Sequence, residues 1–314
     1  MLYLYISKSN NPYQNLATED FLVDFANRNK NIYILYFWQN ENTVVVGRNQ
    51  DVFAEVNIDY VKENKIHIVR RKTGGGAVFH DKNNLNFSFI VPKNKFDKIT
   101  SSKIIQSALK NLGIDAQISG RNDILVHNKK ISGNAYLNKE NVTLHHGTIL
   151  LDTNFELLEK SLNVSEVKLN KHSVKSIKSR VLNLKEIYPD LTLETLKESI
   201  LKEFEKCYSK KHTQFPTKIE TTQKNFYSSD EWIFGDKKFI KLDKYSKNFN
   251  WGICEIKILK NQNENHIKIY SDALDTDIIQ NAEIFINTQQ KPEKTTDKKI
   301  VEIYEFYNDV LALQ

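Results

Sequence analysis

The chain of 314 residues has little cysteine and no long apolar segment. Two cysteines, Cys207 and Cys254, are too few for a disulfide framework or a cysteine-rich metal site. No run approaches the roughly 20 apolar residues of a membrane span, and the N-terminal residues lack the basic segment and apolar core of a signal peptide. We therefore expect a globular protein of the cytoplasm that does not associate with membranes.

Several motifs of common enzyme classes are also absent. The sequence contains no GxxxxGKS/T P-loop, no GxGxxG dinucleotide motif, no HExxH zinc motif and no GxSxG nucleophile elbow. Both cysteines lie far downstream of the glycine-rich segment described below, which argues against thiol acyl transfer. The net charge of +6 suits an anionic substrate or an acidic protein partner, but no dense basic helix indicates nucleic-acid binding.

Glycine is scarce, yet three of the 10 glycines are consecutive, at 74–76. Glycine costs backbone entropy wherever it is ordered, so a triplet is expected where the backbone is unusual or a ligand comes close. Successive N–H groups can converge on an anion, and the guanidinium groups of Arg70 and Arg71 suit phosphate or carboxylate. The triplet joins the predicted strand 66–69 to the alternating strand 86–91, so we predict an anion-binding loop between strands. A flexible hairpin tip beside surface arginines is the alternative.

A second polar group lies on two segments that a turn at 127–129 would join into a hairpin. Arg121, Asn122 and Asp123 precede the turn, and Lys130 follows it in a strand-like context. A fixed ammonium group can bridge a carboxylate and a nucleotide phosphate, hold them in line and offset the negative charge that develops as they react. We therefore predict that Lys130 is the catalytic residue; a solvated hairpin lysine is the alternative.

The remaining hydrophobic pattern predicts further strands and helices. Strands are expected at 2–6, 32–38, 43–46, 114–118 and 142–151, and helices at 17–26, 57–64, 100–112, 154–162 and 193–207. Because side chains alternate faces along a strand, only one of His145 and His146 can face a given pocket. Asp152 or Thr153 is expected to cap the helix that follows, and Thr192 the later one.

The C-terminal part of the chain is predicted to form a separate unit. Residues 209–250 indicate a final hairpin followed by a linker. Two strands and two helices are expected after it, at 253–259, 266–270, 277–286 and 298–312. Alone, this αβ module would be only marginally stable, because small domains bury a low fraction of their surface, so it should dock on the main body. The lysine-rich stretch 168–180 is either a solvated loop or a docking segment for an acidic partner.

The segments RRKTGGGAVFHDKNNLNFSFI, GRNDI, KISGNAY and HHGTILLD, in this order, resemble the lipoate–protein ligase A family. The later segments SIKSRVLNLKEIYP, WGICEIKI and IYSDAL are also similar to that family, so the resemblance covers nearly the whole chain. One departure is Lys72, which adds a charge where the family often has a small hydroxyl residue, whereas Thr73 keeps a hydroxyl.

The resemblance implies an α+β fold shared with biotin–protein ligases. Residues 1–247 would form a catalytic domain with a mixed β-sheet flanked by helices, and residues 248–314 a small C-terminal α/β accessory domain. ATP and lipoate would form lipoyl-AMP and pyrophosphate, and the lipoyl group would then pass to a lysine of an acceptor protein. The implied acceptors are acidic lipoyl domains of 2-oxoacid dehydrogenase E2 subunits and the glycine-cleavage H protein. We expect the enzyme to be a monomer.

Carried over to this sequence, the resemblance assigns two overlapping sets of site residues. The adenylate would contact Arg71, Thr73, Gly75, Gly76, Ala77, Val78, Phe79, Asn122, Asp123 and Lys130. Lipoate would contact Trp38, Arg71, His80, Lys130, His146 and Gly147. Mg²⁺ would accompany the triphosphate, with Asp123 as its protein contact. Trp38, Val78 and Phe79 supply an apolar slot for the acyl chain, whose burial is worth about 0.8 kcal/mol per CH₂; for Trp38, a plain core position is the alternative.

Other functions remain open at this point. An ATP-independent lipoyl or octanoyl transferase of the same superfamily would keep its activity when ATP is omitted. A biotin ligase is disfavoured, because the GRGRxxR-type loop of that family is absent. A non-enzymatic basic binding module would show a nucleic-acid affinity that falls steeply with salt, and no adenylation.

Overall fold

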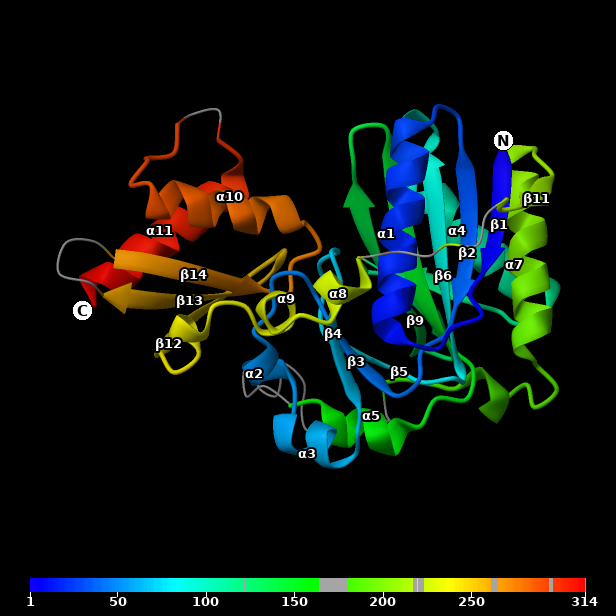
Figure 1. Cartoon of the computed structure of the whole chain (residues 1–314), viewed down its shortest axis with the longest axis horizontal. Coiled ribbons are helices and arrows are strands. Elements are labelled where there is room, and N and C mark those ends of the chain that lie inside the picture. The colour runs from blue at the N-terminus through cyan, green and yellow to red at the C-terminus, as the bar shows by residue number, and fades with distance from the viewer. Residues whose placement is uncertain are drawn as a thin grey trace.

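The computed structural model describes residues 1–120, 122–163, 180–216, 219, 223–260, 265–293 and 296–313. Arg121 and all but the last residue of the lysine-rich stretch 168–180 lie outside the described residues. Within them the chain forms a larger body and a smaller C-terminal unit (Figure 1). No helix in the described part of the chain is long and apolar enough to cross a membrane.

The larger body is built on a mixed sheet of eight strands in the order β11-β1-β2-β6-β10-β9-β8-β7. Its strands are β1 (Leu2–Ile6), β2 (Tyr33–Trp38), β6 (Asn84–Pro92), β7 (Gln117–Ser119), β8 (Asp123–Val126), β9 (Lys129–Asn138), β10 (Val142–Leu150) and β11 (His212–Gln214). β1 pairs in parallel with β2 and β11, and the other pairs are antiparallel. β2 and β6 are buried along their whole length, because they lie in the middle of a sheet that is covered on both faces.

Helices cover both faces of this sheet. α4 (Lys98–Asn111) and α7 (Leu193–Tyr208) pack on one face, where Phe89, Ile105 and Phe204 belong to the same fully buried core. α1 (Pro12–Arg28) crosses the other face and buries Leu16 and Leu22 against it. Thr192 caps α7, as predicted. The fold class predicted from the sequence is therefore confirmed.

A second, three-stranded sheet carries the glycine triplet. β3 (Thr43–Val46) lies between the parallel β4 (His67–Arg70) and the antiparallel β5 (Val78–His80). Short helices pack against this sheet: α2 (Val52–Glu55), α3 (Ile58–Glu63), α5 (Phe155–Ser161) and α9 (Asp230–Phe234). The glycine loop runs from strand to strand, as predicted. It returns first through β5, however, and β6 follows only after a further turn.

The C-terminal unit has its own sheet and its own core. β12 (Lys244–Phe249), β13 (Gly252–Lys260) and β14 (Asn265–Ser271) form an antiparallel sheet, and α10 (Thr276–Asn287) and α11 (Lys298–Ala312) share one core with it. Figure 1 shows both helices on the same side of this sheet. The expected domain boundary between residues 247 and 248 falls inside β12, which the sequence analysis did not predict.

The smaller unit docks on the larger body around residues 49–51. Lys257 Nζ lies 2.7 Å from Asp51 Oδ2, and both side chains are buried. The Ser271 N–H donates to the Asn49 carbonyl at 2.8 Å, and Asn49 Nδ2 donates to the Thr276 carbonyl at 3.3 Å. The expected docking of the C-terminal module is therefore present in the structure.

Two local predictions are wrong. The described part of residues 209–250 contains no hairpin: β11 joins the sheet edge beside β1, and α8 (Lys224–Tyr227) and α9 follow. The partner of β11 lies about 200 residues earlier, so a local pattern could not reveal the pairing. Helix α5 is capped by Asn154, whose Oδ1 accepts from the N–H groups of Glu156 and Leu157. The side chains of Asp152 and Thr153 also carry an oxygen that can cap a helix, so residue type alone did not identify Asn154 as the cap.

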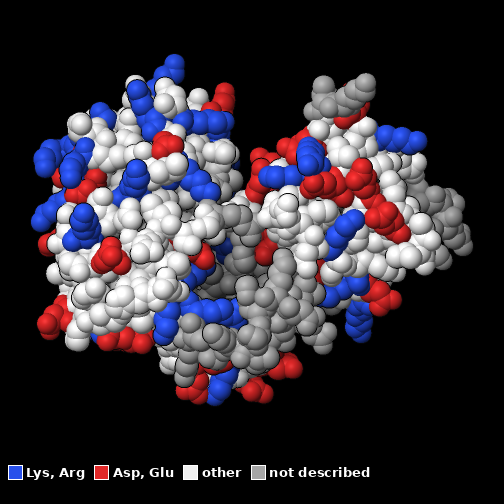
Figure 2. Space-filling model, turned by 180° about the vertical axis from the view of Figure 1, so that it is seen from behind, with Lys and Arg blue, Asp and Glu red and all other residues white. Residues whose placement is uncertain are grey.

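Charge is distributed unequally between the two units. Residues 244–314 contain nine Lys and eleven Asp or Glu, whereas residues 1–243 contain 36 Lys or Arg and 28 Asp or Glu. On the face shown in Figure 2, Lys and Arg spread over the larger body, and Asp and Glu form a band on the smaller unit. The formal net charge is therefore positive on the larger body and negative on the smaller unit.

Candidate active site

A cavity of about 640 Å³, its open mouth included, lies between the large sheet, α1 and the glycine loop. Eleven of the fourteen predicted site residues line it: Trp38, Arg71, Gly75, Gly76, Ala77, Val78, His80, Asn122, Lys130, His146 and Gly147. The structure thus brings together segments that are far apart in the sequence, namely the end of β2, the glycine loop, the β8–β9 hairpin and the middle of β10.

Three predicted residues do not line the cavity. The Phe79 side chain packs in a separate core with Val46, because residues alternate faces along β5 and its neighbour Val78 takes the cavity side. Thr73 lies behind Arg71, and Asp123 lies beside Lys130. Of the predicted apolar slot, Trp38 and Val78 are therefore in place and the Phe79 ring is not.

The two arginines before the glycine triplet hold the backbone in place. Arg70 is buried and lies outside the cavity lining. Among the described residues it donates to carbonyl oxygens at 2.6 to 3.1 Å, those of Gly47, Arg48, Gln50, Trp232 and Ile233. Arg71 lines the cavity, and its Nη2 donates to the carbonyls of Gly74 and Gly76 at 2.6 and 2.9 Å. Gly75 between them has φ +92°, a conformation that favours glycine. Arg71 therefore sets the curvature of the triplet.

A two-residue turn brings Lys130 to the cavity. His127 and Asn128 have φ values of 49° and 60°, as in a type I′ turn, and they join β8 to β9. Lys130 Nζ lies 2.8 Å from Asp123 Oδ1 across this hairpin, and both side chains are about one-third exposed. A Cβ at Gly133 would lie 3.1 Å from Lys130 Nζ, so the missing side chain leaves room for the lysine at the cavity wall. An ammonium group with one accessible carboxylate partner can exchange that partner for a substrate anion.

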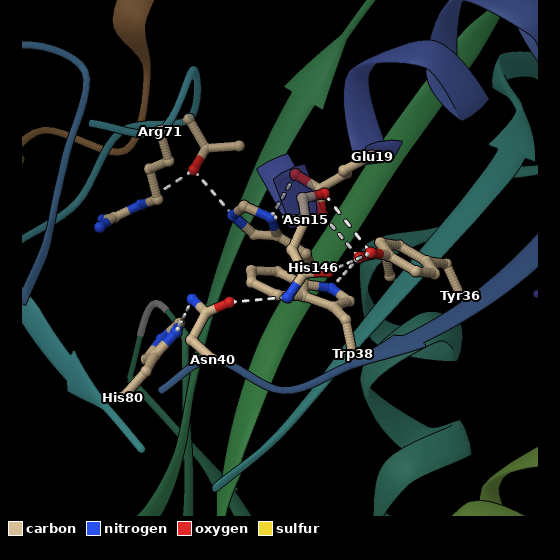
Figure 3. A network of polar contacts seen from close by, with 10 residues as sticks. Asn15, Glu19, Tyr36, Trp38, Asn40, Arg71, His80 and His146 are labelled. Carbon is tan, nitrogen blue, oxygen red and sulfur yellow. Dashed lines mark hydrogen bonds and ion pairs between the residues drawn. The ribbon is translucent and has the colours of Figure 1, made fainter. Parts of the chain in front are cut away.

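A hydrogen-bonded chain links Arg71 to Glu19 across the cavity wall (Figure 3). Arg71 Nε donates to Thr73 Oγ1 at 3.0 Å, and Thr73 Oγ1 lies 2.8 Å from His146 Nε2. His146 Nδ1 lies 2.9 Å from Glu19 Oε1. Because the guanidinium only donates and the carboxylate only accepts, the hydroxyl of Thr73 donates to Nε2 and Nδ1 carries the proton. The chain thus fixes His146, which lines the cavity, in one tautomer.

The same carboxylate is also connected to Trp38. Ser88 donates to Glu19 Oε1 at 2.5 Å and accepts from Trp38 Nε1 at 2.9 Å, which holds the indole against the cavity. The sequence analysis missed Glu19. The feature that could have predicted it is a carboxylate at a buried position of the amphipathic helix α1, because a buried charge requires partners.

The adjacent histidines of β10 face opposite sides of the sheet, as strand alternation predicts. His146 lines the cavity, whereas His145 is fully buried on the other face. Its Nδ1 lies 2.6 Å from Ser101 Oγ, and its Nε2 lies 2.9 Å from Asn134 Oδ1. Burial lowers the pKa of His145 to about 3, so the ring is neutral at physiological pH. His145 therefore ties the β9 strand behind the cavity to α4.

Seven lining residues were not predicted: Leu16, Val45, Asn86, Gly133, Asn134, Ala135 and Thr148. Asn86 and Thr148 are paired across β6 and β10, so they line one row of the sheet. The sequence pattern that could have predicted them is a polar residue at every second position of an otherwise apolar strand. The position of Leu16 depends on how α1 crosses the sheet, which a local pattern does not reveal.

The C-terminal unit reaches the glycine triplet. The Gly75 N–H donates to the Ala273 carbonyl at 3.0 Å. A Cβ at Gly74 would lie 2.2 Å from the same oxygen, whereas a Cβ at Gly76 would meet nothing within 4 Å. Gly74 is therefore required by close contact with the C-terminal unit, whereas Gly75 is required by its positive φ and by the nearby Arg71 guanidinium. In this arrangement the Gly75 N–H binds a carbonyl oxygen, and whether it binds an anion stays a prediction.

Comparison with known proteins assigns the chain to a family. Residues 11–205 match the model of the lipoyl protein ligase A/B catalytic domain. The lipoate-protein ligase A of Psychrobacter cryohalolentis is 36% identical over 285 residues, which cover 86% of this chain and 83% of that protein. The chain belongs to the lipoyl protein ligase A/B family.

Solved structures support the lipoyl ligase fold over nearly the whole chain. The crystal structure of P. falciparum LipL1 in complex with lipoate matches with a TM-score of 0.75 and 29% identity, covering 97% of this chain and 94% of that one. A crystal structure of lipoate-protein ligase A bound with ATP matches with a TM-score of 0.63 and 25% identity, covering 74% and 98%. The resemblance inferred from the sequence is confirmed.

The cavity of this lipoyl ligase offers few groups for a metal ion. No cluster of three or more His, Cys, Asp and Glu side chains occurs among the residues that the structure describes. Asp123, which forms an ion pair with the lining residue Lys130, is a single, partly exposed carboxylate. This donor set fits a Mg²⁺ ion held mainly by phosphate oxygens and one carboxylate, and it does not fit a metal centre built from protein ligands alone.

Proposed function

We propose that this chain activates lipoate with ATP in the described cavity and that Lys130 is the catalytic residue. As a family member, the chain is an ATP-dependent lipoate–protein ligase. In the first step the lipoate carboxylate attacks the α-phosphorus of ATP, which forms lipoyl-AMP and releases pyrophosphate. In the second step a lysine amine of an acceptor protein attacks the acyl carbon, and AMP leaves. The observation that carries the proposal is that Lys130, Arg71, Gly75 and Gly76 line one cavity.

The residues of the cavity divide these tasks. Lys130 exchanges Asp123 for the lipoate carboxylate and the α-phosphate, and its charge offsets the negative charge that develops as the two react. Arg71 keeps the triplet curved around the nucleotide. Trp38 and Val78 enclose the acyl chain. Asp123, released from its ion pair, is the carboxylate that would hold Mg²⁺, whose charge would balance that of the triphosphate when bound.

Two relatives support the choice of substrates. LipL1 was solved in complex with lipoate, and a lipoate-protein ligase A was solved with ATP. For the acceptor we propose acidic lipoyl domains of E2 subunits and the H protein, because the larger body carries an excess of Lys and Arg. The proposal includes a monomeric enzyme in the cytoplasm that binds neither nucleic acid nor membranes.

We also propose that the larger body and the C-terminal unit are a catalytic and an accessory domain. The boundary would lie just before β12, because that strand pairs with β13 of the accessory sheet. The Gly75 N–H can bind a phosphate only after it leaves the Ala273 carbonyl, so the accessory domain would move away from the loop during the reaction.

The test measures lipoate-dependent exchange of pyrophosphate into ATP. Lys130→Ala should lose at least about 100-fold, the usual effect of removing one group that stabilises developing charge. Lys129→Ala is the matched control, because Lys129 belongs to the same strand and does not line the cavity. Normal exchange in the Lys130 variant would refute its role. Acyl transfer from a preformed donor, with ATP omitted and no exchange, would instead identify a transferase.

A further inference from the structure

We propose that His80 makes the cavity selective for the dithiolane ring of lipoate over a plain eight-carbon chain. We further propose that Asn15 and Asn40 are positioning residues that fix the proton of His80. The inference rests on the proposed function, because it takes lipoate as the acyl substrate. It adds a reason why the cavity prefers lipoate to octanoate, an acid with the same carboxylate and chain length.

A relay of two side-chain amides determines which ring nitrogen of His80 carries the hydrogen (Figure 3). Asn15 Nδ2 lies 2.8 Å from the Gln39 carbonyl, which can only accept, so the orientation of the Asn15 amide is fixed. Asn15 Nδ2 also donates to Asn40 Oδ1 at 2.9 Å, and the Tyr36 hydroxyl lies 3.3 Å from Asn15 Oδ1. Asn40 Nδ2 then faces His80 Nδ1 at 3.2 Å. Nδ1 is therefore the acceptor, and Nε2 carries the hydrogen.

The N–H group at His80 Nε2 is buried and has no partner. The residue is 3% exposed, and Nε2 forms no hydrogen bond to any of the described residues. Burial lowers the pKa of His80 to about 3, with Arg71 and His146 as smaller causes, so the ring is neutral and has one hydrogen to donate. A buried donor without an acceptor is unfavourable, which makes this group a place where a ligand atom is expected.

His80 itself lines the cavity, next to apolar residues. The rings of His80 and Trp38 are 5.9 Å apart, and Val78 lies on the same face of β5 two residues earlier. Asn86, which is paired with Trp38 across β2 and β6, also lines the cavity, and its buried Nδ2 has no partner in the described part of the chain. Trp38 therefore has two neighbours in the cavity lining, His80 and Asn86, that each carry an unpaired buried donor.

A 1,2-dithiolane matches this arrangement, and an alkyl chain does not. Sulfur is a weak hydrogen-bond acceptor and contacts aromatic rings favourably. The two adjacent sulfur atoms of lipoate can thus meet the N–H groups of His80 and Asn86 while the ring lies against Trp38. Octanoate would fill the same space with methylene and methyl groups and leave both donors unpaired.

The test compares kcat/KM for lipoate and octanoate in pyrophosphate exchange. We expect the native enzyme to prefer lipoate by about tenfold, and His80→Phe to reduce the preference to about twofold, since it keeps a ring and removes the donor. His67→Phe is the matched control and should keep the native ratio, because His67 pairs with Glu41 away from the cavity lining. A ratio of the two acids is insensitive to partial misfolding, which lowers both rates together.

The relay has a spectroscopic test of its own. Long-range ¹H–¹⁵N spectra of histidine-labelled protein, assigned by difference from His80→Phe, should show His80 as the Nε2–H tautomer. Asn40→Leu removes the donor to Nδ1 and should introduce the Nδ1–H form together with a reduced preference for lipoate. Equal kcat/KM for the two acids in the native enzyme, or an unchanged ratio in His80→Phe, overturns the selectivity. A native Nδ1–H tautomer overturns the relay. If neither acid supports exchange, the proposed function itself has failed, which is a different result from an exchange without preference.

Discussion

The ion pair between Lys257 and Asp51 is one of the contacts that hold the C-terminal unit on the larger body. It joins β13 to the start of α2, and the two side chains are only 5% and 7% exposed. Lys257 Nζ has a further contact to the Ile240 carbonyl at 3.3 Å. The other carboxylate oxygen of Asp51 caps α2 by accepting from the Phe53 N–H at 3.0 Å. Each charge therefore has neutral partners besides the ionic one.

The structure predicts a non-additive effect on stability. Lys257→Met leaves the buried carboxylate of Asp51 without its ionic partner, and Asp51→Asn does the same to the buried ammonium of Lys257. Each substitution should therefore lower the free energy of unfolding by about 3 to 5 kcal/mol. The double variant Lys257→Met/Asp51→Asn leaves neither charge behind, and the asparagine oxygen can still cap α2. We expect the double variant to lose about 1 kcal/mol, well below the sum of the single losses.

Urea unfolding measures these losses by tryptophan fluorescence, to which Trp251 of the C-terminal unit and Trp38 and Trp232 of the larger body contribute. Lys298→Met is the control, because Lys298 is 89% exposed and its pair with Glu302 spans 3.9 Å. Such a surface pair is worth less than about 1 kcal/mol. A double variant as unstable as the sum of the single variants would show that stranded charge is not the cause, and the reasoning would fail.

Two further predictions concern the glycine loop and pH. Gly74→Ala should weaken domain docking by about 1 to 3 kcal/mol, because its Cβ would lie 2.2 Å from the Ala273 carbonyl, whereas Gly76→Ala should not. Hydrogen exchange at residues 271–274 should rise only in the first variant, and an equal rise in both would refute the steric argument. Stability should fall as pH drops below about 6.5 towards 3, because the unfolded state then binds protons that the buried His80 and His145, with pKa about 3, do not. Each histidine should lower the free energy of unfolding by about 2 kcal/mol between pH 7 and 5. In urea unfolding, His145→Gln should reduce the slope of this free energy against pH by the amount that corresponds to about one bound proton.

Local features of the sequence predicted much of this fold. Alternation predicted the opposed directions of His145 and His146, and the polar turn predicted the hairpin that brings Lys130 to the cavity. The error at Phe79 has the same basis, because the sequence does not say which face of a short strand meets a ligand. Glu19 was missed for a different reason: its role depends on Ser88 and His146, which only the packing of α1 on the sheet brings near it.

The glycine triplet shows what a sequence motif leaves undecided. Its composition indicates that something must approach the backbone closely, and both an anion and the C-terminal unit meet that condition. In the structure the Ala273 carbonyl approaches Gly75, and Gly76 remains open. A phosphate that binds the Gly75 N–H must displace this carbonyl. Under the proposed function, the contacts that hold the C-terminal unit, the Lys257–Asp51 pair among them, would therefore oppose nucleotide binding at the loop. A more stable docked form then means a lower affinity for the nucleotide. A substitution that leaves an unpaired charge in the interface should therefore favour the state in which the Gly75 N–H is free of the Ala273 carbonyl.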